Sequence, residues 1–132
     1  MPKHATPGSR SRLLLAGFFI IAGVLHFVFM PAYMRIVPPW LPSPRILVIV
    51  SGLFEIAGGL GVLAAATRRW AGYGLIALCV AVLPANLQML VDAQAAGASA
   101  VWITLLVLRL PLQLLLIAWI WCATRPNNLR QP

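Results

Sequence analysis

Four apolar blocks, each long enough to cross a bilayer, constrain this chain more than any other feature of its sequence. A hydrocarbon core of about 30 Å needs roughly 20 helical residues to span it. The blocks are residues 13–30, 46–66, 70–91 and 101–122. Because the bilayer interior offers no hydrogen-bond partner to the backbone, each block is expected to be a helix. The sequence therefore predicts an all-α integral membrane protein, a transmembrane four-helix bundle formed by residues 13–122.

The composition excludes a soluble domain. The chain is 61% hydrophobic and 9% charged, whereas soluble domains are about 45–50% apolar and about 25% charged. Its net charge of +8 raises the question of nucleic-acid binding. The basic residues, however, flank the apolar blocks and form no stripe with interleaved aromatic residues. We therefore expect the lipid bilayer, and no nucleic acid, as the partner.

The distribution of basic residues predicts the orientation. Residues 1–12 are expected to form a disordered basic tail, and residues 123–132 a second tail. The N-terminal tail carries three Lys or Arg, the break after the second block two, the C-terminal tail two, and the opposite loops two in total. We expect the protein in the inner (plasma) membrane of the cell. By the positive-inside rule, both termini and their tails face the cytoplasm. No small-residue cleavage site follows the first block, so we expect a retained helix and no signal peptide.

Prolines punctuate the chain at two places. Residues 31–45 contain five prolines and allow only a short turn at 32–37, because each proline removes a donor and restricts its predecessor. Tyr33 and Trp40 suit the headgroup layer, so this loop is predicted to cap the outer mouth of the bundle. Pro84 falls inside the third block and leaves a carbonyl in the preceding turn that needs another donor.

Polar residues interrupt the apolar blocks at a common depth. Counted from the external boundary at about 1.5 Å per residue, five of them lie roughly 6 to 15 Å deep, and a glutamine lies in the fourth block. The predicted polar pocket consists of His26, Ser51, Glu55, Asn86, Arg109 and Gln113. Intramembrane ionisable residues are rare and turn inward toward partners. This layer therefore predicts a pocket that opens toward the external face.

Glu55 and Arg109 are the charged members of this layer, and two interpretations stay open. They form an inert ion pair that fixes helix register, or they line a pocket that accepts a ligand or a proton. Three side chains are expected to supply apolar walls near the same mouth, namely Met30, Met89 and Trp102. Trp119 and Trp121 are expected at the opposite interface.

No intrinsic redox or metal centre is predicted. Cys79 and Cys122 show no C-x-x-C or metal-type spacing, so neither a disulfide nor a metal site is expected. His4 and His26 are the histidines of the chain, and they cannot form a bis-histidine haem site within the bilayer. Catalytic residues are unknown at this point, and whether the protein is an enzyme stays open.

Five stretches, in this order and spacing, resemble the DoxX-like family of small bacterial four-helix membrane proteins. They are residues 23–27 (GVLHF), 37–42 (VPPWLP), 51–59 (SGLFEIAGG), 69–74 (RWAGYG) and 83–87 (LPANL). The fourth block matches only loosely, so Arg109 enters the predicted pocket through its depth alone. Some members of that family are subunits of membrane oxidoreductases that pass electrons from sulfur compounds to quinone, so the resemblance implies that any electron transfer uses a bound quinone or a partner subunit.

Three hypotheses of function follow. The first is a multi-pass, quinone- or redox-associated membrane subunit of the DoxX-like type. The second is a carrier of a small, weakly polar solute, with a homo-oligomer formed through glycine faces. The third is a structural membrane protein that binds a partner chain.

Overall fold

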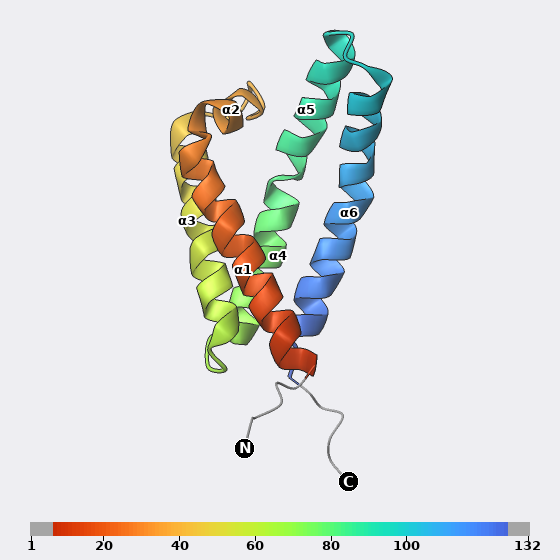
Figure 1. The fold of residues 1–132 in the computed structure, drawn as a ribbon. Helices are drawn as coiled ribbons and strands as arrows, with labels where there is room; N and C mark the ends of the chain where they lie inside the picture. Colours follow the sequence, from red (N-terminus) through yellow and green to blue (C-terminus); the bar gives the residue numbers. More distant parts are fainter. Residues whose placement is uncertain (1–6, 127–132) are drawn as a thin grey trace.

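The computed structural model describes residues 7–126, and this part of the chain forms helices joined by short connections, with no strand. The helices are α1 (Pro7–Val28), α2 (Met30–Arg35), α3 (Pro44–Leu63), α4 (Arg68–Ala81), α5 (Leu83–Ala95) and α6 (Ala100–Thr124) (Figure 1). The predicted all-α bundle is confirmed. We call the end that carries α2 the α2 end, and the opposite end, where α1 begins and α6 ends, the termini end (Figure 1).

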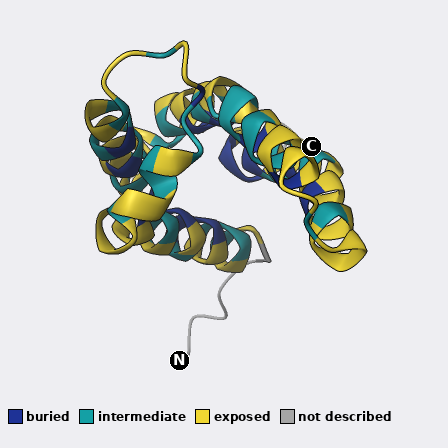
Figure 2. Ribbon diagram, turned by 90° about the horizontal axis from the view of Figure 1, so that it is seen from above, coloured by how far each residue is buried: buried dark blue, intermediate teal, exposed yellow. Residues whose placement is uncertain are grey.

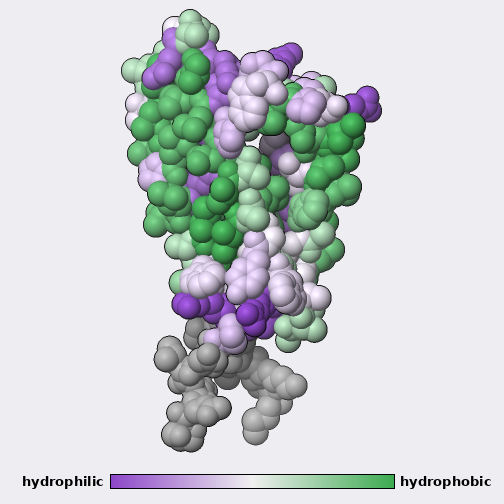
Figure 3. Space-filling view, turned by 180° about the vertical axis from the view of Figure 1, so that it is seen from behind, coloured by the Kyte–Doolittle hydropathy of each residue, from purple (hydrophilic) through white to green (hydrophobic). Residues whose placement is uncertain are grey.

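Four helical stretches are long and apolar enough to cross a membrane. They are residues 8–28, 44–63, 68–95, which comprises α4 and α5, and 100–124. Exposed positions cover the outside of the bundle and buried positions face its interior (Figure 2). Large hydrophobic side chains occupy many of the exposed positions, and hydrophilic side chains gather at the two ends (Figure 3). An apolar outer surface of this extent requires lipid contact, so the chain is a multi-pass membrane protein.

Helices α1 and α3 pack closely because glycines remove side chains from their interface. A Cβ atom at Gly23 would lie 2.6 Å from the carbonyl oxygen of Gly52, and a Cβ at Gly52 would lie 2.9 Å from the Cβ of His26. Small residues at helix contacts let membrane helices approach through their backbones. This contact brings His26 on α1 beside the turn of α3 that carries Glu55.

The core lies at the termini end, where α1, α3, α4 and α6 converge (Figure 1). Its buried members are Leu15, Phe19, Val62, Leu75, Cys79, Ile120 and Ala123. Hydrogen bonds close the same end: Arg12 Nε donates to the carbonyl oxygen of Ala123 over 3.1 Å. Arg68 Nε donates to the carbonyl of Val62 over 2.8 Å, in the last turn of α3. The bundle is therefore sealed at this end.

The third apolar block is divided into two helices. α4 ends at Ala81 and α5 begins at Leu83, with Val82 in a turn between them. Pro84 stands in the first turn of α5, where its missing N–H and fixed φ are tolerated. In the last turn of α4, the Cys79 carbonyl accepts a hydrogen bond from Gln113 Nε2 of α6. A side chain of the neighbouring helix α6 thus supplies a donor to a carbonyl at the break between α4 and α5.

The helix bounds correct several expectations. α1 begins at Pro7, so residues 7–12 are helical and do not belong to a disordered tail. Proline is favoured in a first helical turn, and nothing between Pro7 and the apolar block breaks a helix. The turn expected at 32–37 is the helix α2, two residues earlier in the chain. The remaining parts of the predicted tails, residues 1–6 and 127–132, lie outside the described residues.

Candidate functional site

A cavity of about 660 Å³ lies between the helices, beneath α2 and the loop that follows it. All six residues of the predicted polar layer line it: His26 on α1, Ser51 and Glu55 on α3, Asn86 on α5, and Arg109 and Gln113 on α6. Its volume falls within the range of about 300–1,000 Å³ that is typical of ligand pockets. Residues that the sequence places at similar depths on four different helices therefore line one cavity.

The imidazole of His26 is held against α1 and beside Glu55. Its Nδ1 lies 2.9 Å from the carbonyl oxygen of Ala22 and 3.2 Å from Glu55 Oε2. Because a carbonyl can only accept, Nδ1 carries a proton and directs it at Ala22. Glu55 Oε2 is fully buried; its basic neighbour within 4.0 Å is this Nδ1, whose proton points at Ala22, so no donor of residues 7–126 is aligned for a hydrogen bond to it. This oxygen is an unsatisfied acceptor on the wall of the cavity.

Tyr33 on α2 contributes to the polar wall of the cavity, although its sequence position indicated only a residue of the headgroup layer. Its ring stacks on His26 with the centroids 4.1 Å apart, and it lines the cavity. Burial and the nearby Glu55 raise the pKa of the Tyr33 hydroxyl, while the charge of Arg109 opposes this change. The phenol is therefore held in its neutral, donating form at the α2 end of the cavity.

Arg109 lies across the cavity from the acid and does not pair with it. Its Nη1 contacts the sulfur of Met89 at 3.5 Å, and no acidic side chain of the described residues lies within 4.0 Å of it. The predicted Glu55–Arg109 ion pair is wrong, because equal depth on two helices does not bring side chains together across a cavity. The guanidinium therefore keeps hydrogen-bond donors directed toward no anion of the described chain.

Asn86 and Gln113 are committed to contacts between helices. Asn86 Nδ2 donates to Gln113 Oε1 over 2.6 Å, and Gln113 Nε2 donates to the carbonyl of Cys79. Both side chains are buried. This network joins α4, α5 and α6, so the two amides define the shape of the cavity wall, and each commits one N–H to a contact between helices.

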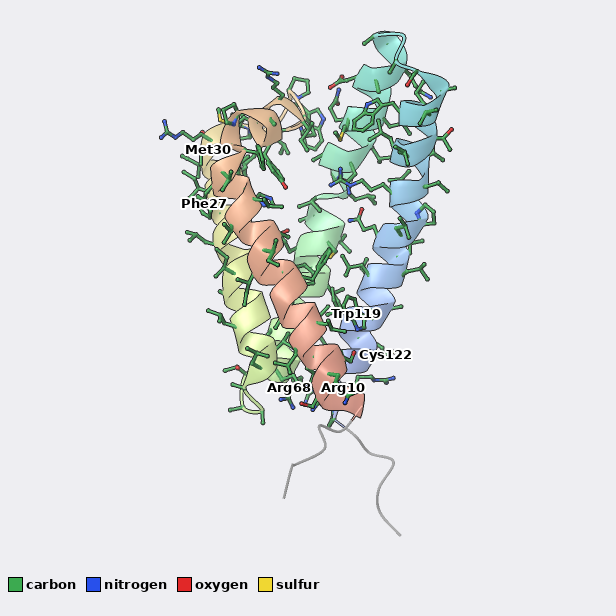
Figure 4. All side chains as sticks on the ribbon, in the orientation of Figure 1. Arg10, Phe27, Met30, Arg68, Trp119 and Cys122 are labelled. Carbon is green, nitrogen blue, oxygen red and sulfur yellow. The ribbon has the colours of Figure 1, made fainter. Side chains whose placement is uncertain are left out.

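The apolar wall differs from the one predicted. Met30, Met89 and Trp102 do not line the cavity; Phe18, Phe19, Leu112, Leu115, Leu116 and Trp119 do. Trp119 points from α6 toward α1 (Figure 4), and its Nε1 donates to Ser11 Oγ over 2.8 Å. Its place near the end of the fourth block suggested an interfacial residue. The hydroxyl of Ser11 holds the indole inside the bundle instead.

Among the polar groups that line the cavity, Glu55 Oε2 is a fully buried acceptor without a hydrogen bond, and the hydroxyls of Tyr33 and Ser51 and the guanidinium of Arg109 are available as donors. The remaining lining is largely apolar. Cys79 and Cys122 are free thiols, the first buried and the second exposed. Residues 7–126 contain no cluster of three or more side chains suited to hold a metal ion. The arrangement suits an amphiphilic molecule with a few oxygen atoms at one end.

Comparison with known proteins places the chain in a family without an assigned activity. Residues 15–124 match the model of a family described as a domain of unknown function, DUF8561, and the chain belongs to that family. No curated protein and no solved structure matches the chain.

Proposed function

We propose that this DUF8561 protein binds a small amphiphile with one or two hydrogen-bonding oxygens, of the quinone type, and acts as a quinone- or redox-associated membrane subunit. The observation that carries the proposal is the buried Oε2 of Glu55, which lines a cavity and lacks a donor. Leaving a buried polar group unsatisfied costs about 1–3 kcal/mol. A ligand that supplies the missing partner removes this cost.

The donors and the acceptor suit the two states of a quinone headgroup. A quinone has carbonyl oxygens that accept hydrogen bonds, for which Tyr33 and Arg109 are donors on the cavity wall. The reduced form carries hydroxyl groups that donate, for which the Glu55 carboxylate is an acceptor. Donors and an acceptor in one cavity therefore accommodate both forms.

A partner is proposed as the source of electrons. Within residues 7–126 no three side chains are placed to hold a metal ion, and Cys79 and Cys122 are free thiols. The proposal therefore includes a partner subunit that carries the redox centre, as the DoxX-like resemblance of five sequence stretches implies. The protein would then supply the quinone site and its hydrogen bonds.

The proposal places the protein in the inner membrane with both termini in the cytoplasm and α2 outside. Five arginines of the described chain lie near the termini end: Arg10, Arg12, Arg68, Arg69 and Arg125. This asymmetry supports the orientation through the positive-inside rule. Fusions of a periplasm-active reporter at Ser43 and after Pro126 test it, since activity at the second site alone would reverse the orientation.

Trp119 provides the direct test of binding, because its indole lines the cavity. The purified protein in detergent is titrated with a short-chain quinone while tryptophan emission is followed. We expect saturable quenching that is largely lost in Trp119→Phe and weakened about tenfold in affinity in Arg109→Gln, through loss of a charge-assisted hydrogen bond. Trp102→Phe is the matched control, since Trp102 lies on the same helix outside the cavity.

Two results would contradict the proposal. Quenching that rises linearly with quinone and is equal in all variants would show partitioning into detergent. Quenching that saturates but persists in Trp119→Phe would place the bound molecule elsewhere. Either result would favour the structural or carrier hypotheses over a quinone site.

A further inference from the structure

The cavity is not enclosed on all sides by the bundle. Helix α1 is held to α3 through the Gly23–Gly52 contact. Helix α6 is held to α4 and α5 through Gln113. The two halves meet at the termini end, where α1 and α6 lie close together, and α1 and α6 diverge toward the α2 end (Figure 1). Residues of both helices line the cavity, and we call the space between these helices on the α2 side the gap.

The hydrogen bonds and the aromatic contact between α1 and α6 lie at Trp119 and nearer the termini end. Below Trp119, Arg12 Nε bonds the carbonyl of Ala123, and Ser11 Oγ accepts from Trp119 Nε1. The highest aromatic contact across this pair joins the rings of Phe18 and Trp119, with centroids 6.5 Å apart. Trp119 therefore forms the floor of a gap that continues toward the α2 end.

Side chains along this gap face both the cavity and the outer surface. Phe18 on α1 lines the cavity and is 48% exposed. Leu112 and Leu115 on α6 also line it and are 60% and 65% exposed. Exposed apolar side chains of both helices thus border the cavity, and we infer that it opens between α1 and α6. Its rim is apolar and lies within membrane-spanning helices, so the opening faces lipid.

We propose that the ligand enters from the bilayer between α1 and α6 and keeps an apolar tail in this opening while its polar head lies near Glu55 and Arg109. This inference rests on the proposed ligand site and adds the route and the tail. A tail in this gap meets leucine and phenylalanine on the rim and lipid beyond them. Tail length is therefore unrestricted, whereas a closed cavity of about 660 Å³ would reject a long tail.

The test compares a tail-less quinone with a long-tailed quinone that has the same ring. Each is offered to the protein in lipid nanodiscs, and the amount retained above that in empty nanodiscs is extracted and quantified. We expect the native protein to retain both saturably. Leu115→Trp should weaken retention of the long-tailed quinone by about tenfold, as a steric misfit in a binding site does, and should weaken retention of the tail-less quinone clearly less.

Leu114→Trp is the matched control, because Leu114 is 68% exposed on the same helix and does not line the cavity. Retention of the tail-less quinone alone by the native protein would overturn the lateral opening and leave the ligand site intact. Equal effects of Leu115→Trp and Leu114→Trp, or equal loss of both quinones in Leu115→Trp, would also overturn it. Retention of neither quinone by the native protein would remove the proposed function and this inference together.

Discussion

The two halves of the bundle are held together by different physical means. Between α1 and α3, backbones approach through Gly23 and Gly52, and the contact needs no polar side chain. Between α4, α5 and α6, the side-chain amides of Asn86 and Gln113 carry the connection near the break at Val82. The half formed by α1 and α3, which we call the close half, is a close packing of small residues. The half formed by α4, α5 and α6, which we call the jointed half, is held by hydrogen bonds between its helices.

This difference explains where the cavity forms. The close half carries the acid, Glu55, and the jointed half carries the cation, Arg109. Neither the glycine contact nor the amide network joins α1 to α6. The acid and the cation therefore line one cavity without pairing. The cavity is the space left between the close half and the jointed half, which are held together by different kinds of contact.

The largest effect is expected from breaking the close half. An added methyl group in Gly52→Ala would lie 2.9 Å from the Cβ of His26 and 3.1 Å from the carbonyl oxygen of Gly23. Because backbone is involved, we expect a loss of about 3 kcal/mol in the free energy of unfolding, the upper end of the overpacking range. Thermal unfolding in detergent, followed by circular dichroism, measures it.

Gly17→Ala is the control for that substitution. Nothing lies within 4 Å of a Cβ at Gly17 on α1. Alanine favours a helix over glycine by up to about 1 kcal/mol, so Gly17→Ala should leave stability unchanged or raise it. Equal losses in the two variants would mean that the close approach of α1 and α3 does not hold this half together.

A second experiment asks whether the two halves are linked by charge. Glu55→Leu removes a buried oxygen that lacks a donor, so we expect the free energy of unfolding to rise by about 2 kcal/mol. Because Glu55 and Arg109 form no ion pair, the effects of Glu55→Leu and Arg109→Leu should add within about 0.5 kcal/mol in the double variant. Destabilised single variants rescued in the double variant would restore the ion pair.

The smallest effect is expected in the jointed half. Gln113→Leu removes the bonds to Asn86 and to the Cys79 carbonyl. Hydrogen bonds between membrane helices average about 0.6 kcal/mol, so a loss of about 1 kcal/mol is expected. Gln88→Leu is the control, since the Gln88 amide contacts only Asp92 within α5. An effect of Gln113→Leu no larger than that of the control would show that shape alone holds α4, α5 and α6 together.

The sequence predicted the fold well because the bilayer restricts it so strongly. Apolar length located the four spans, and Pro84 located the break in the third. The start of α1 was missed because the prolines and serines before Leu13 resemble a loop in composition, although Pro7 in a first turn is compatible with a helix.

The sequence predicted how deep the site residues lie along their helices, but not how each helix is rotated about its axis. Counting residues along each helix brought Glu55, His26 and Arg109 into one layer, and all line the cavity. Which of them touch depends on how the helices are rotated. The glycine contact between α1 and α3 places His26, rather than Arg109, beside Glu55. Trp119 was missed for a related reason, since Ser11 draws it inward from a helix not adjacent in sequence.

The division of the third block also gives the protein two hydrophobic thicknesses. α3 has 20 residues, whereas the stretch 68–95, which comprises α4, Val82 and α5, has 28. At about 1.5 Å per residue, α3 matches a hydrocarbon core of about 30 Å, and the α4–α5 pair exceeds it by about 12 Å. The excess must be accommodated by tilt, by projection of α5 beyond the core, or by local thickening of the bilayer. Bilayer thickness therefore acts mainly on the α5–α6 side, so a change in lipid length shifts one wall of the cavity relative to the other.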